Sequence, residues 1–184
     1  MQIYLLSNDK DCYDAFHHYF WKEKDVLPVY ADFSDFMRMY QVECVVSPAN
    51  SFGIMDGGYD EAITAYYGGA LQKSVQAYIL SHYYGEQPVG TSFIIDTGRD
   101  GQKLIHTPTM RTPSVIREHK VIYQAMRTTL ICAMENSISS IVIPAFGAAT
   151  GGVPAMTVAY YMRKGYDQIK KPPREITWQD IERF

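Results

Sequence analysis

The sequence predicts an α/β sandwich, in which helices cover a largely buried β-sheet. Short β-rich apolar runs alternate along the chain with segments of helical periodicity. Most of these runs lack polar alternation, which is typical of strands that are buried on both faces. A length of 184 residues suffices for one domain with a full hydrophobic core. We expect that domain over residues 1–165 and a C-terminal extension over 166–184.

The predicted strands are the short apolar runs, and they recur along most of the chain. They cover residues 2–7, 26–31, 43–48, 89–96, 103–107 and 140–145. A helix over 10–22 follows Asn8 and Asp9, either of which can cap it. A shorter helix is predicted over 33–40. The residue before it, Asp32, can serve as its cap or accept a hydrogen bond from the exocyclic amine of a ligand.

Glycine and proline mark the later helices. These helices are predicted over residues 60–84, 115–136 and 154–164. Gly68 and Gly69 are expected to break the first of them in two, because each glycine costs about 1 kcal/mol relative to alanine inside a helix. The second carries apolar residues at every fourth position (Ile122, Met126, Leu130, Met134). The third begins at Pro154, which is favoured at a first helical position, and is expected to stop at Gly165.

The amino-acid composition changes after the last of these helices. Residues 170–174 form a basic, proline-stiffened linker, and a short capped helix is predicted from Thr177. Trp178 or Phe184 is expected to dock this solvated segment onto the body of the domain.

The composition argues against several classes of protein. Seventeen Lys and Arg against twenty Asp and Glu give a net charge of −3, which leaves no basic field to hold a nucleic-acid backbone. No apolar run reaches the roughly 20 residues of a membrane span, and the N-terminus turns acidic too early for a signal peptide. Three cysteines without a C-x-x-C pair predict reduced thiols rather than disulfides or a zinc site. We therefore expect a soluble, cytoplasmic protein that binds neither nucleic acid nor membrane.

Two glycine-rich loops after predicted strands carry the functional signal. They read SPANSFGIMDGGYDEAI over 47–63 and PAFGAATGGVPAM over 144–156. In an open α/β sheet these positions lie at the carboxyl ends of the strands, where ligands bind. Glycines let consecutive N–H groups converge on an anion, and the following helix adds the positive end of its dipole. Neither loop contains Lys or Arg, which excludes a P-loop and predicts a phosphate held by backbone amides.

Polar side chains in the first loop admit two interpretations. Asn50 can both donate and accept hydrogen bonds, as is needed to hold a ribose diol. Asp60 can cap the following helix, which is the simpler interpretation, or it can orient or deprotonate a water molecule. His106 lies in a predicted buried strand and is expected to be a hydrogen-bonded core residue rather than a general base.

An ordered set of segments resembles the motifs of the macro domain family, the ADP-ribose-binding module. These segments are ADFS (31–34), VVSPAN (45–50), DGGYD (56–60), LIHTP (104–108) and PAFGAATGGVP (144–154). The resemblance covers about residues 25–165 and is nearest to the branch that processes ADP-ribose 1''-phosphate. It implies a three-layer α/β/α sandwich around a mixed sheet of about six strands.

The resemblance also implies a binding site. Asp32 would receive the adenine amine, with Phe33 or Phe146 as the aromatic residue on that side. Asn50 would hold the distal ribose, and Ala49 beside it would also contact the ligand. Further along, the resemblance places Gly57 and Gly58 beside that ribose and the adjoining phosphate, and it places the diphosphate within the amides of Gly147, Ala148, Ala149, Thr150, Gly151 and Gly152.

The chemistry implied by the resemblance is hydrolysis at the distal ribose. Asp60 falls on the aspartate that helps to position the attacking water, with Asn50 beside it, and neither a metal nor another cofactor is implied. The resemblance therefore implies an ADP-ribose-binding domain that hydrolyses mono-ADP-ribosylated protein or a small derivative such as ADP-ribose 1''-phosphate. A non-catalytic reader of free or protein-attached ADP-ribose is the alternative. A nucleotide-binding α/β domain with another ligand is a third, more distant one.

Several positions depart from the family pattern. Ser47 and Pro48 replace the first asparagine and the first alanine of the family's V-N-A-A-N motif. Gly151 replaces an aromatic residue that closes over the distal ribose in hydrolytic members, so the pocket is expected to be more open there. The strand that often follows the last helix is not evident, and residues 1–24 lie outside the simplest form of the pattern.

Overall fold

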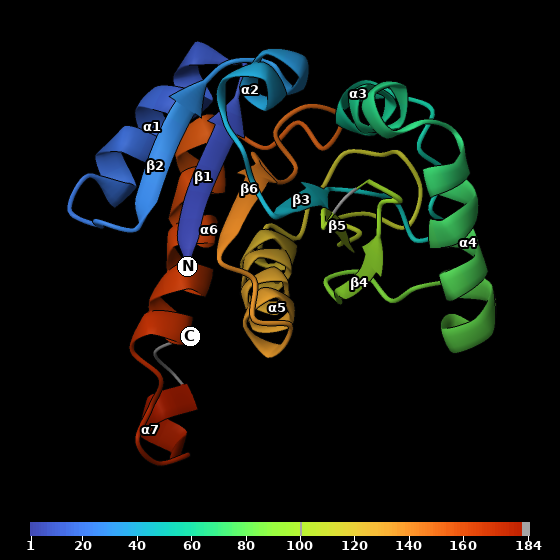
Figure 1. Cartoon of the computed structure of the whole chain (residues 1–184). Coiled ribbons are helices and arrows are strands. Elements are labelled where there is room, and N and C mark those ends of the chain that lie inside the picture. The colour runs from blue at the N-terminus through green and yellow to red at the C-terminus, as the bar shows by residue number, and fades with distance from the viewer. Residues whose placement is uncertain (100, 182–184) are drawn as a thin grey trace.

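The computed structural model describes residues 1–99 and 101–181 and contains a six-stranded sheet (Figure 1). Its strands are β1 (Gln2–Ser7), β2 (Val26–Tyr30), β3 (Cys44–Ser47), β4 (Phe93–Asp96), β5 (Lys103–His106) and β6 (Ser140–Pro144). The strand order is β2-β1-β6-β3-β5-β4, and every pairing is parallel except that of β4 with β5. The expected mixed sheet is confirmed.

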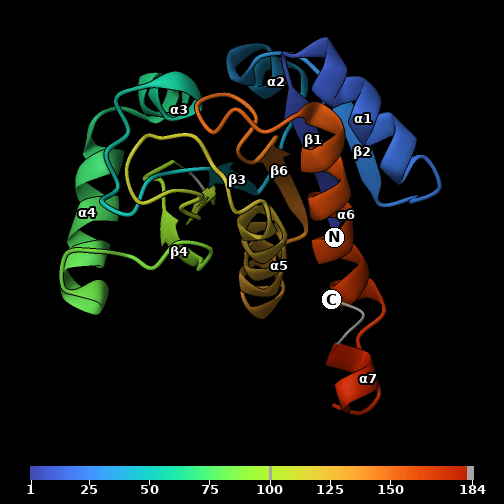
Figure 2. The ribbon, with the colours of Figure 1, turned by 180° about the vertical axis from the view of Figure 1, so that it is seen from behind.

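Helices cover both faces of this sheet. They are α1 (Lys10–Phe20), α2 (Phe33–Met39), α3 (Gly58–Tyr67), α4 (Ala70–Tyr83), α5 (Lys120–Glu135), α6 (Ala155–Lys170) and the short α7 (Trp178–Ile181). One core cluster packs α1, α5 and α6 against one face, and a second packs α2, α3 and α4 against the other. The two views of the ribbon show these layers from opposite sides (Figures 1 and 2).

Side chains along each strand alternate between the two faces of the sheet and therefore contribute to both cores. In β6, Ile141 and Ile143 point into the cluster under α5 and α6, while Val142 between them points into the cluster under α2 and α3. All three side chains are completely buried. This double burial explains why the strand sequences are continuously apolar rather than alternating.

The predicted helix boundaries hold at the start of the chain and in the middle. Asp9 caps α1 by accepting a hydrogen bond from the N–H of Asp11, and Asp32 caps α2 in the same way through Asp35. The chain breaks between α3 and α4 at the glycine pair, where Gly68 adopts a φ of 94°. The capping residues and the glycine pair were sufficient to predict these helix boundaries, because each acts within one turn of the chain.

The start of α5 was predicted five residues too early, at 115 instead of Lys120. Residues before Lys120 are irregular because Ile116 is held by another part of the chain. Its N–H donates to the carbonyl of Gly151 at 2.9 Å, and its side chain is buried. Met134, counted in the apolar stripe of this helix, is exposed. The strand predicted over 89–96 also begins later, at Phe93.

The prediction that the last long helix stops at Gly165 is wrong, because α6 continues to Lys170. Gly165 is buried where α6 crosses α5. A Cβ at this position would lie 2.9 Å from the Met126 Cβ and 2.9 Å from the carbonyl oxygen of Tyr123. The glycine therefore serves close helix packing rather than helix termination.

We expect Gly165→Ala to destabilise the protein by about 1 to 3 kcal/mol, because the added methyl group meets backbone atoms that cannot move away cheaply. Chemical denaturation measures this loss. Gly69→Ala is the matched control, since Gly69 has a helical φ of −65° and no atom within 4 Å of its added Cβ. The control should be neutral or slightly stabilising, and equal stability of both variants would contradict the packing role of Gly165.

The C-terminal segment lies apart from the body of the domain (Figures 1 and 2). The predicted short helix is present as α7, but the expected docking of Trp178 is wrong because 82% of its surface is exposed. Phe184 lies outside the described residues. Within those residues, the chain after α6 forms no strand, and β1 lies between β2 and β6.

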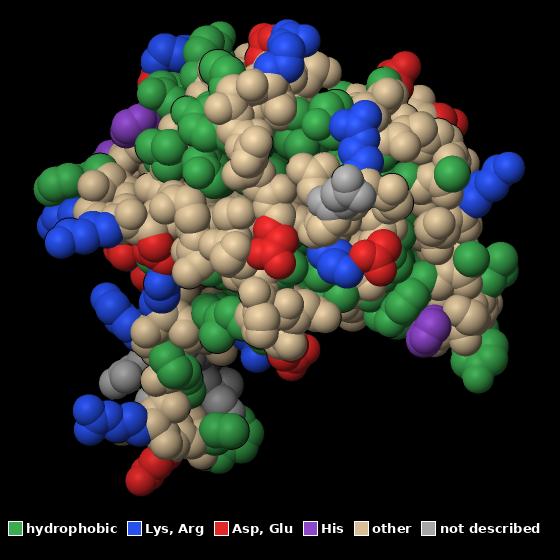
Figure 3. Space-filling view, in the orientation of Figure 1, with side chains coloured by type: hydrophobic (Ala, Val, Ile, Leu, Met, Phe, Trp, Pro, Cys, Tyr) green, Lys and Arg blue, Asp and Glu red, His purple; other side chains and the backbone are tan. Residues whose placement is uncertain are grey.

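Other global expectations can be compared with the described residues. All three cysteines are free and buried, as expected. None of the helices in the described ranges is long and apolar enough to cross a membrane. On the face seen in Figure 3, acidic and basic side chains are interspersed rather than gathered into one extended patch.

Candidate functional site

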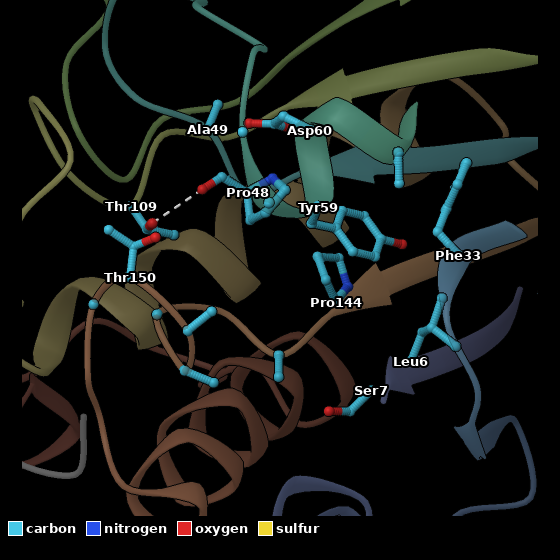
Figure 4. A pocket seen from close by; sticks show the side chains of 18 of the residues that line it. Leu6, Ser7, Phe33, Pro48, Ala49, Tyr59, Asp60, Thr109, Pro144 and Thr150 are labelled. Carbon is cyan, nitrogen blue, oxygen red and sulfur yellow. Dashed lines mark hydrogen bonds between the residues drawn. The ribbon is translucent and has the colours of Figure 1, made fainter. Parts of the chain in front are cut away.

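A cavity of about 700 Å³ lies at the carboxyl ends of the parallel strands. Its walls come from the segments that follow β1, β2, β3, β5 and β6, together with the first turn of α3. In the close view, Phe33, Leu6 and Ser7 lie at one end and Thr109 and Thr150 at the other (Figure 4). The volume falls in the range of small-molecule and cofactor sites.

The structure brings nearly all of the predicted site residues together around this cavity. Those that line it are Asp32, Phe33, Ala49, Asn50, Gly57, Gly58, Asp60, Gly147, Ala148, Ala149, Thr150 and Gly151. Phe146 does not line it as predicted, because its fully buried side chain packs in the core beneath the sheet. Gly152 is also absent from the lining.

The late loop contains amides without protein acceptors beside the cavity. Gly147 adopts a φ of 76°, which lets the loop turn sharply, and its carbonyl accepts from the N–H of Val153 at 3.1 Å. Between them, the N–H groups of Ala149, Thr150 and Gly151 donate to no protein acceptor in the described ranges. A row of unpaired donors beside a cavity is an anion-binding geometry.

The first turn of α3 supplies the second set of donors. The helix begins at Gly58, and its N-cap Gly57 has no side chain to accept from the first turn. The N–H groups of Gly58, Tyr59 and Asp60 therefore lack side-chain acceptors, and the helix dipole adds partial positive charge at this point. None of the described residues that line the cavity is Lys or Arg.

Residues at the end of β1 also line the cavity, and the sequence analysis did not assign them to the site. Ser7, Asn8 and Asp9 lie beside Asp32 because β1 and β2 are neighbours in the sheet. Their polar types after a strand were visible in the sequence. The position of β1 in the sheet was not, because strand order depends on contacts far apart in the chain.

The aromatic side chain at this end of the cavity is Phe33. It packs edge-on against the rings of Tyr59 and Tyr66, at centroid distances of 5.4 and 5.8 Å. Asp32 beside it uses one carboxylate oxygen to cap α2. Its capping role is thereby established, and it also lines the cavity.

The space that a side chain at position 151 would need is occupied by other parts of the chain. The segment over residues 110–116 runs beside the first loop through the bridge between Asn50 and Met110. Met110 and Pro113 line the cavity. A Cβ on Gly151 would lie 2.7 Å from the Cδ1 atom of Ile116, so this segment fills the space that a side chain would need. The expected open rim stays a prediction, because Ile116 belongs to the core and does not line the cavity.

Asn50 is mostly engaged within its own loop. Its Nδ2 donates to the carbonyl of Ile54 at 2.7 Å, and its Oδ1 accepts from the N–H groups of Phe52 and Ile54 at 3.1 and 3.4 Å. One hydrogen of the Nδ2 group remains for a ligand. The residue therefore shapes the loop that lines the cavity.

Asp60 is not the cap of α3, so the capping interpretation was wrong. It stands in the first turn, three residues after the N-cap Gly57, and its Oδ1 accepts from the Ser47 hydroxyl at 2.7 Å. The side chain is 8% exposed and lines the cavity. Burial raises the pKa of its carboxyl from the ordinary 3.8 to about 7, although the hydrogen bond from Ser47 opposes this rise.

His106 is a core residue, as predicted, but only one of its ring nitrogens has a partner. Nδ1 lies 2.6 Å from the Oε1 atom of Gln87, while Nε2 is buried without a partner. Burial lowers the pKa of the imidazole from 6.5 to about 3. Its ring stacks on Phe93 with a centroid distance of 5.2 Å. The histidine is therefore neutral near pH 7 and does not line the cavity.

Comparison with known proteins places the chain in a family. The model of the Macro domain family matches residues 46–162. Two uncharacterized proteins are similar in sequence. One, from Aquifex aeolicus, is 30% identical over 70% of this chain and 73% of its own length. The other, from Aeropyrum pernix, is 32% identical over 65% of this chain and 60% of its own length. The match thus spans less than two thirds of the Aeropyrum protein.

Solved structures show the same fold. The Oceanobacillus iheyensis macrodomain with MES bound superposes with a TM-score of 0.64 at 20% identity, over 78% of this chain and 82% of that one. The macrodomain of Mycobacterium tuberculosis DarG gives a TM-score of 0.61 at 22% identity, over 71% and 84%. With the family match covering both cavity-lining loops, the chain belongs to the macro domain family.

Proposed function

We propose that this macro domain binds ADP-ribose and hydrolyses mono-ADP-ribosylated protein, or a small derivative such as ADP-ribose 1''-phosphate. One observation carries the proposal: amide groups without protein acceptors, from the late loop and from the start of α3, border the same cavity. A diphosphate between them would receive charge-assisted hydrogen bonds, each contributing about 1.5 to 3 kcal/mol net.

The order of the strands supports one orientation of the ligand. The cavity extends along the strand ends from β2 to β5, with the late loop near its middle. Adenine would lie near Asp32 and Phe33, where a carboxylate and a ring are available. The distal ribose would then lie near Asn50 and Thr109, within reach of Asp60.

Related structures support ADP-ribose as the ligand. The Oceanobacillus iheyensis macrodomain has been solved with ADP and, as a glycine-to-valine variant, with ADPR. It has also been solved as an asparagine-to-alanine and as an aspartate-to-alanine variant. The three substituted positions are spaced along that chain as Asn50, Gly57 and Asp60 are along this one.

The environment of Asp60 supports hydrolysis. With a pKa of about 7, its carboxylate is a stronger base than an exposed aspartate and is partly ionised at neutral pH. In the proposed step, a water oxygen attacks the anomeric carbon of the distal ribose and Asp60 takes the water proton. The bond to the leaving group breaks, and the leaving group takes up a proton from solvent. The negative charge of Asp60 stabilises the oxocarbenium-like transition state.

A non-catalytic reader of ADP-ribose is the second candidate, and Gly151 favours it. A Cβ there would lie only 2.5 Å from the carbonyl oxygen of Gly147, so no side chain at this position can close over the ribose. The reader and the hydrolase share the same binding site and differ in the fate of the bound ligand.

Binding is tested by thermal shift with ADP-ribose, AMP, ADP, NAD and GDP. ADP-ribose should give the largest shift, because it alone offers the adenine, diphosphate and free distal ribose together. At about 100 times its Kd it should stabilise the fold by about 2.7 kcal/mol. A panel in which ADP-ribose does not rank first would remove both candidates.

Hydrolysis is tested by incubating a mono-ADP-ribosylated protein with the wild type and with Asp60→Ala. The wild type should remove the label, and the variant should be at least about 100-fold slower, because its base is missing. Asp96→Ala is the control, since Asp96 is exposed at the end of β4 and pairs with Lys103. Retention of the label by the wild type would identify a reader.

A further inference from the structure

Ser47 makes the one side-chain hydrogen bond that Asp60 receives in the described part of the chain. Ser47 is the last residue of β3, and none of its surface is exposed. Its Oγ donates to the Oδ1 of Asp60 at 2.7 Å. The two residues are thirteen positions apart, so the bond connects the sheet to the first turn of α3.

The anchor of this bond is rigid. The backbone of Ser47 is in register with His106 on β5, and its carbonyl accepts from the N–H of Thr107 at 3.0 Å. A serine has one side-chain rotor, and burial removes most of its alternatives. The Ser47 hydroxyl is therefore held in a fixed position from which it donates to the Asp60 carboxylate.

Few other groups near Asp60 can stabilise its charge. The neighbouring Tyr59 has a buried hydroxyl with no partner, and Asp32 at the start of α2 and Asp56 before α3 border the same cavity with the same sign of charge. His106 on β5 is neutral near pH 7, and α4 contributes no residue to the lining. Among the described groups, Ser47 and the N-terminus of α3 remain as the stabilising ones.

We propose that Ser47 is a positioning residue that keeps the Asp60 carboxylate ionised and directs its second oxygen toward the cavity. With Oδ1 held by the hydroxyl, Oδ2 is left as the oxygen that can accept a water proton. The catalytic consequence rests on the proposed hydrolysis, but the effect on the ionisation of Asp60 does not. Ser47 at the end of β3 and Asp60 in α3 thus act as one unit.

The test compares Ser47→Ala with Ser51→Ala. Ser51 is a buried serine in the following loop, and its Oγ has no hydrogen-bond partner. Both variants remove one buried hydroxyl, but Ser47→Ala alone removes the donor to Asp60. Ser47→Thr keeps a hydroxyl and Ser47→Asn restores the residue of the family pattern, and both serve as rescue variants.

The first readout is an NMR titration of the Asp60 side-chain carboxyl carbon in the ligand-free protein. Loss of a hydrogen bond to a charged group should raise the midpoint by about one to two pH units in Ser47→Ala. Ser51→Ala should titrate like the wild type. An unchanged midpoint in Ser47→Ala would overturn the proposal, whether or not the protein is a hydrolase.

The second readout is the pH dependence of hydrolysis. At pH 7, Ser47→Ala should be about 5- to 50-fold slower than the wild type. It should recover most of that loss by pH 9, where at least half of Asp60 is ionised. A purely structural defect would lower the rate equally at every pH, and that result would overturn the proposal. If the wild type shows no hydrolysis, the proposed reaction fails while the titration still decides the role of Ser47.

Discussion

Asp60→Asn is expected to make the protein more stable at neutral pH while removing the proposed hydrolytic activity. Burial raises the pKa of Asp60 from 3.8 to about 7. The protonated carboxyl therefore contributes stability that is fully present below pH 3.8 and is lost as the pH rises through 7. Asparagine is neutral at every pH and can still accept the hydrogen bond from Ser47. The Asp60→Asn variant should therefore keep the stability that the wild type loses as the pH rises through 7.

The expected gain is about 2 to 4 kcal/mol above pH 7, since each pH unit between the two pKa values corresponds to about 1.4 kcal/mol. The difference in unfolding free energy between Asp60→Asn and the wild type should be near zero at pH 4 and should grow until about pH 7. Urea denaturation at a series of pH values measures this difference. Asp14→Asn, at an exposed residue paired with Lys10, is the control and should change the unfolding free energy by less than about 1 kcal/mol.

The contribution of His106 to the pH dependence of stability opposes that of Asp60 in the wild type. Its folded pKa of about 3 lies below its ordinary 6.5, so the unfolded chain takes up a proton that the folded protein excludes. This contribution to stability is present above pH 6.5 and is lost as the pH falls toward 3. Between pH 4 and 6.5 the two residues therefore have opposite slopes. Removing Asp60 should leave a steeper increase of stability with pH, and an unchanged slope would contradict the raised pKa of Asp60.

This stability effect is the expected signature of a functional carboxylate. A buried aspartate with a single side-chain donor is costly to the fold, and an asparagine or an apolar residue would fit the same place at lower cost. Its presence at the border of a cavity is explained if the ionised form has a task there. The stability gain and the loss of hydrolysis in Asp60→Asn should therefore appear together.

Local sequence signals predicted most of the elements correctly. The strand runs, the capping by Asp9 and Asp32 and the break at the glycine pair depend on residues within one or two turns of each other. The two glycine-rich loops were also predictable as one site, because the carboxyl ends of parallel strands share one edge of the sheet. The family resemblance assigned roles to residues that already had suitable chemistry.

The errors have a common physical cause, which is contact between segments remote in sequence. Gly165 looked like a helix end because its neighbour in α5 could not be seen in the sequence. Phe146 looked like a ligand-stacking residue because its direction depends on how β6 turns into its loop, which buries it. The bond between Ser47 and Asp60 likewise replaced the local capping interpretation with a contact across the fold.

Gly151→Ala should abolish most of the proposed affinity for ADP-ribose. The added Cβ would lie 2.5 Å from the carbonyl oxygen of Gly147 and 2.7 Å from the Cδ1 atom of Ile116. The Ile116 side chain can rotate, but the Gly147 carbonyl is fixed by its hydrogen bond from Val153. The backbone of the late loop must therefore shift, and its unpaired amides move with it.

Displacing two charge-assisted hydrogen bonds should cost about 3 kcal/mol or more, which corresponds to a loss of about 100-fold in affinity. Calorimetric titration with ADP-ribose measures this loss, and thermal unfolding of the ligand-free variant shows whether the domain still folds. Gly69→Ala, which adds the same methyl group at the start of α4 with no atom within 4 Å, should bind like the wild type. If Gly151→Ala folds and binds ADP-ribose with unchanged affinity, the late loop does not hold the diphosphate, because an amide cradle cannot shift and keep all of its hydrogen bonds.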